Sequence, residues 1–109
     1  MKILLDENLP KKLKYDFGEE NEVLTVNDQG WNGKKNGELL GLMVFNGFDA
    51  LVTIDKNLTF QQNISRFPIK IFVFDAKTNK HLDLQVYMEK LNKILKKEIN
   101  QQIINISIE

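Results

Sequence analysis

Two aspartates follow two short apolar segments of the sequence, in positions where carboxylates can bind metal ions. Asp6 follows the apolar residues 3–5, and Asp55 follows residues 50–54 (Ala-Leu-Val-Thr-Ile). Both segments read as strands, and strands joined by helices usually run parallel in one sheet. Their carboxyl ends then share one edge, where open α/β sheets bind ligands. Two carboxylates converging there predict a divalent-metal site.

Other acids are candidates for the same edge of the sheet. Glu38 lies in the first turn of a predicted helix and is the third candidate ligand. The weaker candidates are Glu7, Asp28 and Asp75. Each acid also has a structural interpretation, because acids stabilise helix N-termini and are common in the turns that end strands. Their recurrence at one edge, rather than any single acid, favours the metal site.

The numbers of cysteines and histidines limit which metal ions the chain can bind. The sequence has no cysteine, which excludes thiolate zinc sites, disulfides and cysteine nucleophiles. Its single histidine, His81, cannot form a histidine cluster. Oxygen ligands suit Mg²⁺ or Mn²⁺, so these are the cofactors that we expect.

Lysines flank the candidate acids along the chain, and lysines can hold a nucleic-acid backbone through its phosphates. The candidate nucleic-acid-binding residues are Lys11, Lys12, Lys34, Lys35 and Lys56. For any one of them, a solvated surface lysine is the simpler interpretation. The net charge of the chain is zero, so only a local patch of charge is expected to attract nucleic acid.

The pattern of apolar residues predicts alternating strands and helices in one domain over residues 1–109. Strands are expected at residues 1–6, 22–26, 50–54, 69–74 and 103–108. Helices are expected at 9–17, from 36 or 37 to about 45, and at 82–100, with a loop or one short helical turn at 57–63. This order predicts an α/β fold of three layers with a mostly parallel central sheet of about five strands.

Apolar content and segment lengths predict a folded domain without a membrane partner. The sequence is 42% hydrophobic, which supports a core, but no apolar run approaches the ~20 residues of a membrane span. Asp6 ends the first apolar run too early for a signal peptide. The lack of cysteine fits a cytoplasmic protein. Trp31 either stacks on a base or, as we favour, packs as a lid on the core.

Several motifs, found in the same order along residues 1–75, resemble the small PIN-like proteins related to VapC-type toxins. The resemblance lies in Ile-Leu-Leu-Asp-Glu-Asn-Leu-Pro at 3–10, Val-Leu-Thr-Val at 23–26, Gly-Trp at 30–31, Lys-Asn-Gly-Glu-Leu-Leu at 35–40, Leu-Val-Thr-Ile-Asp-Lys-Asn-Leu at 51–58 and Gln-Gln-Asn-Ile at 61–64. The resemblance implies a three-layer PIN-like fold and a Mg²⁺- or Mn²⁺-dependent ribonuclease. It also implies the toxin half of a toxin–antitoxin pair, with a small antitoxin protein as partner, and a homodimer, because relatives often pair.

By this resemblance, Asp6 matches the acid that ends the first strand, and Asp55 matches the acid of a Thr-x-Asp motif. Glu38 is the closest match to the acid on the preceding helix. Many relatives carry aspartate where this chain has Asn36, so the third ligand stays open. A second hypothesis is therefore a catalytically inactive PIN-like module that binds RNA or a protein partner.

Overall fold

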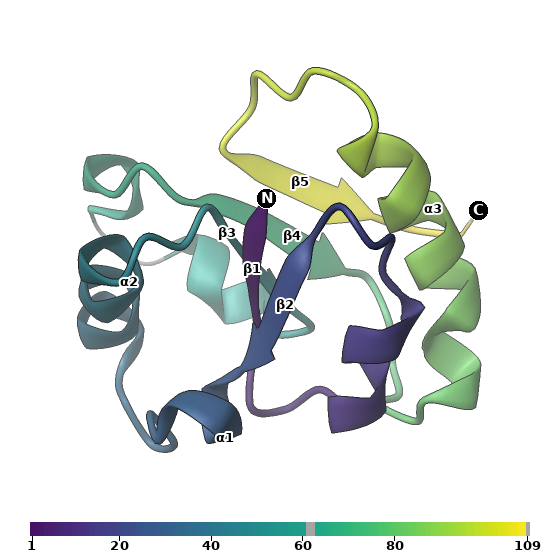
Figure 1. The fold of residues 1–109 in the computed structure, drawn as a ribbon, viewed down its shortest axis with the longest axis horizontal. Helices are drawn as coiled ribbons and strands as arrows, with labels where there is room; N and C mark the ends of the chain where they lie inside the picture. The colour runs from purple at the N-terminus through teal and green to yellow at the C-terminus, as the bar shows by residue number, and fades with distance from the viewer. Residues whose placement is uncertain (61–62, 109) are drawn as a thin grey trace.

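A single parallel sheet organises the chain. The structure is a computed structural model that describes residues 1–60 and 63–108, with 59 and 60 described through their backbone alone. Within these residues the strands are β1 (Lys2–Leu5), β2 (Glu22–Thr25), β3 (Ala50–Thr53), β4 (Lys70–Phe74) and β5 (Ile103–Ile106). Their order is β2-β1-β3-β4-β5, and every neighbouring pair is parallel (Figure 1). The predicted α/β class and five-strand parallel sheet are confirmed.

Helices cover both faces of this sheet, which gives three layers. The α-helices are α1 (Val26–Gln29), α2 (Asn36–Phe45) and α3 (Gln85–Leu95), and the 3₁₀ helices are η1 (Lys11–Asp16), η2 (Lys56–Phe60), η3 (Ile64–Arg66) and η4 (Leu82–Leu84). In Figure 1, α2 lies to the left of the sheet and α3 to the right. No helix in the described part of the chain is long and apolar enough to cross a membrane.

Alternate residues of the buried strands fill two cores, one on each face. Phe72 and Phe74 of β4 pack toward α3 and η1, whereas Ile71 and Val73 pack toward α2. All four side chains are at most 1% exposed. A parallel strand covered on both faces has this pattern, because its side chains alternate between two apolar layers.

The connections of β1 and β3 make the carboxyl ends of these two strands a topological switch point, and we call the region beyond these ends the crevice. β1 lies between β2 and β3. The connection from β1 to β2 carries η1, which packs through Leu13 on the α3 side. The connection from β3 to β4 carries η2 and η3, which pack through Leu58 and Ile64 on the opposite face. Where two neighbouring strands continue to opposite faces, a crevice opens beyond their carboxyl ends, and ligands bind there in open α/β sheets.

The predicted helix at 9–17 is wrong in type and length. The structure has the six-residue 3₁₀ helix η1, which begins after Pro10 in extended backbone. The N–H of Leu9 bonds to the carbonyl of Asp6 at 3.0 Å, which forms a separate turn before η1. Gly18 is not left-handed, so η1 does not end in a glycine C-cap. The crossover to β2 is short, and a tight 3₁₀ helix fits it.

Two further boundaries differ from the prediction. Val26 starts α1 because Thr25 forms a capping box with Asp28, whose carboxylate accepts from the Thr25 N–H at 3.0 Å. α3 ends at Leu95 rather than near residue 100. Ile99 packs against the core on the α3 side, so the chain must leave the helix before it to enter β5.

The turn after β3, the helix α2 and Trp31 complete the description of the local structure. η2 confirms a helical turn within 57–63, and residues 61 and 62 lie outside the described part. α2 leaves part of its apolar surface uncovered, because Phe45 is 89% exposed. Trp31 is a lid, as favoured: it packs against the α2-side core, 5.8 Å from the Phe48 ring centroid.

Candidate functional site

The crevice between β1 and β3 contains the two aspartates that the sequence singles out. Asp6 follows the last residue of β1, and Asp55 lies two residues after the end of β3. Register places Leu5 beside Val52, so the two strands end at nearly the same height. The N–H of Asp6 donates to the Val52 carbonyl at 3.0 Å, which extends the pairing to Asp6 itself.

A buried threonine joins the two aspartates. The Thr53 hydroxyl donates to Asp6 Oδ2 at 2.6 Å and accepts from the Asp55 N–H at 2.9 Å. Thr53 is fully buried, so it cannot exchange these partners for water. This hydroxyl therefore fixes one oxygen of the Asp6 carboxylate and the start of the loop that carries Asp55.

A hydrogen bond from a backbone N–H limits the rotation of each carboxylate. Asp6 Oδ1 accepts from the Glu7 N–H at 2.9 Å, and Asp55 Oδ1 accepts from the Asn57 N–H at 2.9 Å. A carboxylate oxygen has two acceptor sites, so these bonds leave both side chains with capacity for another ligand.

The surroundings of Asp6 change the pKa of its carboxyl group. Burial raises the pKa of Asp6, and the negative charges of Asp55 and Glu7 raise it further. The hydrogen bonds from Thr53 and from the Glu7 N–H act in the opposite direction but do not cancel the rise in pKa. Burial disfavours an ionised carboxylate, and a nearby cation favours it. The site therefore has a negative charge that a bound cation would stabilise.

Glu7 ties the crevice to the loop after α1. Its carboxylate accepts from the Gly33 N–H at 3.3 Å and from Asn32 Nδ2 at 3.4 Å. Gly33 has a φ of 79°, in the left-handed region that favours glycine, and this conformation helps to form the turn beneath Glu7. Glu7 thus holds two backbone segments together beside Asp6.

The other predicted acids lie in separate contacts. Glu38 is exposed and forms an ion pair with Lys34 at 4.0 Å. Asp28 pairs with Lys14 at 3.5 Å, and its pKa is lowered, first by its hydrogen bond from the Thr25 N–H.

The predicted lysines occupy different surroundings. Lys11 and Lys12 are exposed on η1, and Lys34 and Lys35 are exposed before α2. Lys56 forms an ion pair with Asp75, the acid that follows β4. Of these five lysines, the two on η1 are the closest in sequence to Asp6, because η1 starts five residues after Asp6.

The donors in the crevice fit a hard divalent cation. The carboxylates of Asp6 and Asp55 lie within electrostatic range of each other, and carboxylate oxygens are ligands that suit Mg²⁺ or Mn²⁺. Across residues 1–60 and 63–108, no group of three or more histidine or acidic side chains is arranged to hold a metal ion. Glu38 is therefore not gathered with Asp6 and Asp55 in this arrangement.

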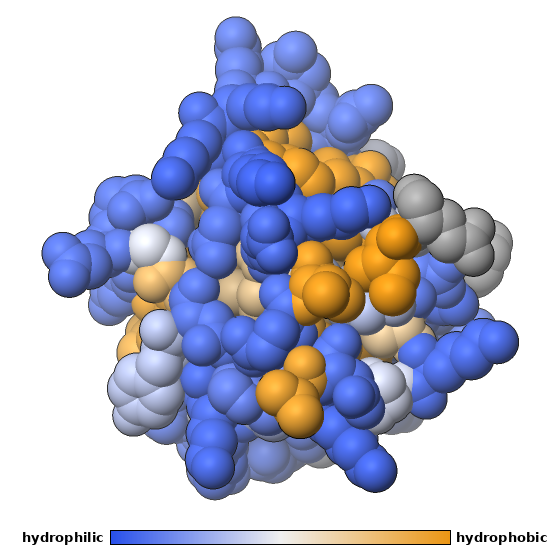
Figure 2. Space-filling model, turned by 90° about the vertical axis from the view of Figure 1, so that its right-hand side faces the viewer, coloured by the Kyte–Doolittle hydropathy of each residue, from blue (hydrophilic) through white to orange (hydrophobic). Residues whose placement is uncertain are grey.

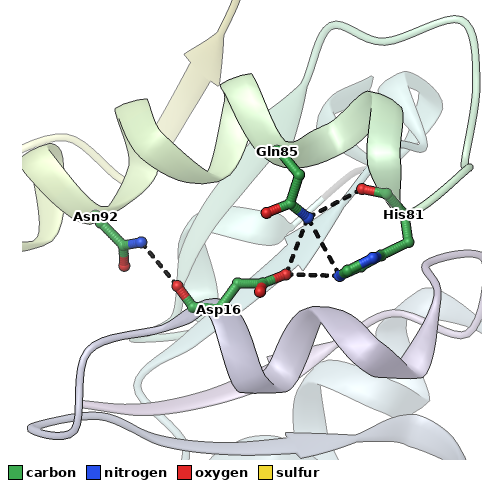
Figure 3. A network of polar contacts seen from close by, with 4 residues as sticks. All are labelled: Asp16, His81, Gln85 and Asn92. Atoms are coloured by element: carbon green, nitrogen blue, oxygen red, sulfur yellow. Dashed lines mark hydrogen bonds and ion pairs between the residues drawn. The ribbon is translucent and has the colours of Figure 1, made fainter.

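Sequence reasoning missed two features of this region. Thr53 gave a signal, since it is a polar residue in a buried apolar strand two positions before an aspartate. The second feature is a network that joins η1 to the start of α3, shown in Figure 3. Its members Asp16 and His81 are 65 residues apart in sequence, and no local pattern links them.

Asp16 is the centre of this network. Its carboxylate contacts His81 Nε2 at 2.8 Å and accepts from Gln85 Nε2 at 3.1 Å, while its carbonyl accepts from Asn92 Nδ2 at 2.9 Å (Figure 3). Nearby, Asn79 Nδ2 donates to the Asn8 carbonyl at 3.3 Å. These bonds fasten the segment after β4 to the segment after β1.

We expect Asp16→Ala to lower the free energy of unfolding by about 1–2 kcal/mol, because the side chains of His81 and Gln85 lose a shared acceptor. Urea denaturation followed by circular dichroism measures this change. Glu19→Ala, which removes an exposed acid three residues away, is the matched control and should change stability by less than about 0.5 kcal/mol. Equal stability of the two variants would contradict a fastening role for Asp16.

Comparison of the chain with protein-family models, with curated proteins and with solved structures found no match in any of the three.

Proposed function

We propose that this protein is a metal-dependent ribonuclease with a PIN-like fold, which binds Mg²⁺ or Mn²⁺ through Asp6 and Asp55. The observation that carries this proposal is the buried Thr53 hydroxyl at the switch point of the sheet, which bonds to the Asp6 carboxylate and to the backbone N–H of Asp55. The motif resemblance in residues 1–75 supports RNA as the substrate. It also supports a role as a toxin with a small antitoxin partner in the cytoplasm.

The roles of the chain's own residues follow from their contacts. Asp6 and Asp55 bind the ion, and Thr53 holds the Asp6 carboxylate in one orientation. When bound, such an ion lowers the pKa of a water molecule and offsets charge on a phosphodiester. Lys11 and Lys12 are exposed on η1, which follows Asp6 along the chain, and in this proposal they attract the phosphates of the RNA. Glu38 is proposed as a third ligand, reached by release of its ion pair with Lys34.

Cleavage of a labelled mixed-sequence RNA with Mn²⁺, Mg²⁺ or EDTA tests this function. We expect cutting by the wild type with metal, and a loss of about 100-fold or more in Asp55→Asn, because several kcal/mol of charge stabilisation is removed. Asp49→Asn is the matched control: Asp49 immediately precedes β3 at the opposite edge of the sheet, where it accepts from the Lys2 N–H. Cutting that persists in Asp55→Asn, or that is equally lost in Asp49→Asn, would contradict the assignment.

A second candidate is a PIN-like module that binds RNA or a protein partner without cleaving it. The observation that favours it is the exposed Glu38, which pairs with Lys34 rather than with the two aspartates. Thermal unfolding with and without Mn²⁺ tests for the metal site of the first candidate. An ion bound to the folded state raises the melting temperature by mass action. A rise that Asp55→Asn abolishes supports the metal site. RNA binding with neither a rise nor cutting supports the second candidate.

A further inference from the structure

The outermost strand of the sheet, β5, has one side in contact with β4. The carbonyl of Gln102 accepts from the Ile71 N–H at 2.7 Å, and the carbonyl of Ile106 accepts from the Asp75 N–H at 2.8 Å. Successive residues of a strand direct their backbone groups to opposite sides within the sheet. Even-numbered residues of β5 therefore face β4, and odd-numbered residues face away from the sheet.

The outward backbone groups belong to Ile103, Asn105 and Ser107. Within the described part of the chain, the backbone N–H and C=O groups of Ile103 and Asn105 on this side form no hydrogen bond. The Ser107 carbonyl accepts from the Lys90 ammonium. An unpaired strand edge is a template for another strand, because its donors and acceptors alternate at the spacing that a strand supplies.

The sequence of this edge lacks the usual protection against pairing. Residues 101–108 read Gln-Gln-Ile-Ile-Asn-Ile-Ser-Ile and contain no charge and no proline. Natural edge strands are commonly protected by lysine, proline or an inward charge. Lys90 of α3 bonds to this edge at the last outward carbonyl. The edge is thus suited to a neutral, apolar strand.

We propose that β5 pairs antiparallel with β5 of a second copy of this chain, around a two-fold axis at Asn105. In this register Asn105 faces its own counterpart, Ile103 faces Ser107, and Ile104 faces Ile106. The outward groups of Ile103, Asn105 and Ser107 then all have backbone partners. A carbonyl oxygen accepts two hydrogen bonds, so Ser107 can keep Lys90 while it pairs. This inference does not depend on the proposed nuclease function.

Side chains on both faces fit this register. Ile104 and Ile106 lie on the α3 side, where Ile106 is buried and Ile104 is partly buried against the core. Across the two-fold axis, Ile104 of each copy faces Ile106 of the other copy, so the apolar layer continues from one copy into the next. Asn105 is exposed on the opposite face, where a substitution changes the pairing but not the core.

Exposed apolar side chains beside β5 extend the surface beyond the backbone ladder. Val86 of α3 is 48% exposed and Ile108 is 51% exposed, and together with Glu89, Lys90 and Lys93 they line one hollow. Figure 2 views this side of the molecule and shows hydrophobic side chains gathered among hydrophilic ones. A second copy on β5 would cover part of this apolar surface.

Charge substitutions at the axis test the pairing. We expect the wild type to sediment as a concentration-dependent dimer in analytical ultracentrifugation. Asn105→Lys and Asn105→Asp each place like charges opposite one another, and each should raise the dimer dissociation constant by about tenfold or more. An equimolar mixture of the two variants places opposite charges across the axis and should restore the dimer. Circular dichroism checks that each variant is folded.

Asn27→Lys is the matched control, because Asn27 is exposed on α1 near the other end of the sheet. It should dimerise like the wild type. A wild type that stays monomeric up to about millimolar concentration overturns the proposal. So does a dimer that survives Asn105→Lys, or a mixture of the two Asn105 variants that remains monomeric.

Discussion

Asp6→Asn is expected to lower metal-dependent RNA cleavage by about 100-fold or more and, in the same protein, to raise stability near pH 7 by about 1 kcal/mol. The loss of cleavage follows from the loss of a charged ligand in the proposed metal site. The gain in stability follows from burial, which raises the pKa of Asp6 in the folded protein and so makes its ionised form unfavourable. Activity and stability therefore change in opposite directions.

The pH dependence of this gain has a definite sign. Below the ordinary aspartate pKa of about 3.9, Asp6 is protonated in both the folded and the unfolded chain, and its burial carries no charge penalty. As pH rises through the window between the ordinary and the raised pKa of Asp6, the unfolded chain ionises first and the wild type loses stability. Asparagine does not ionise, so Asp6→Asn does not lose stability in this way. Its higher stability relative to the wild type should therefore appear across that pH window and vanish in acid.

The melting temperatures of both proteins, measured without metal from about pH 3 to pH 8, check this prediction. A gain of about 1 kcal/mol corresponds to roughly 4–8 °C in a domain of this size. In Asp6→Asn, the side-chain oxygen of the asparagine can still accept from the Thr53 hydroxyl. The backbone N–H of the exposed Glu7 can donate to water instead of to residue 6. If Asp6→Asn were less stable than the wild type near pH 7, hydrogen bonding rather than burial would dominate at this position.

Phe72→Ala is expected to lower the free energy of unfolding by about 3–5 kcal/mol. Phe72 is fully buried in β4, a strand with neighbours on both sides, and its ring fills the core between the sheet and the helices η1 and α3. Removal of the ring loses its transfer free energy and leaves a cavity that β4, held at both edges, cannot close. That loss is a large part of the ~5–15 kcal/mol typical of a whole domain.

Phe45→Ala is the matched control for this variant. It makes the same chemical change on α2, where the ring is 89% exposed, and should alter stability by less than about 0.5 kcal/mol. Urea denaturation followed by circular dichroism compares both variants with the wild type. A similar loss in the two variants would mean that Phe72 does not lie in a packed core.

Strand positions were predictable because their cause is local. The buried runs at 50–54 and 69–74 mark strands by their apolar character alone, and the all-parallel sheet follows from the helices between them. Helix ends were harder, since their causes lie elsewhere in the fold. The short crossover to β2 selects a 3₁₀ helix in η1, and the packing of Ile99 ends α3 early.

Some residues of the candidate site could also be predicted from the sequence, and others could not. Asp6 and Asp55 were found because each follows a predicted strand, and the parallel sheet brings them together. The surroundings of Glu38 were not predictable, because its contacts depend on the path of the loop before α2 and on Lys34. The Asp16 network depends on residues 65 positions apart, which only the folded chain brings into contact.

The parallel order of the sheet also has a consequence for how quickly the site forms during folding. Thr53 and Asp6 are 47 residues apart, and no hairpin brings β1 and β3 together. A chain whose contacts span long sequence separations must close large loops before those contacts stabilise it, which slows folding. The paired aspartates therefore come together only after β3 has docked on β1, and a nascent chain that ends before β3 has no paired carboxylates.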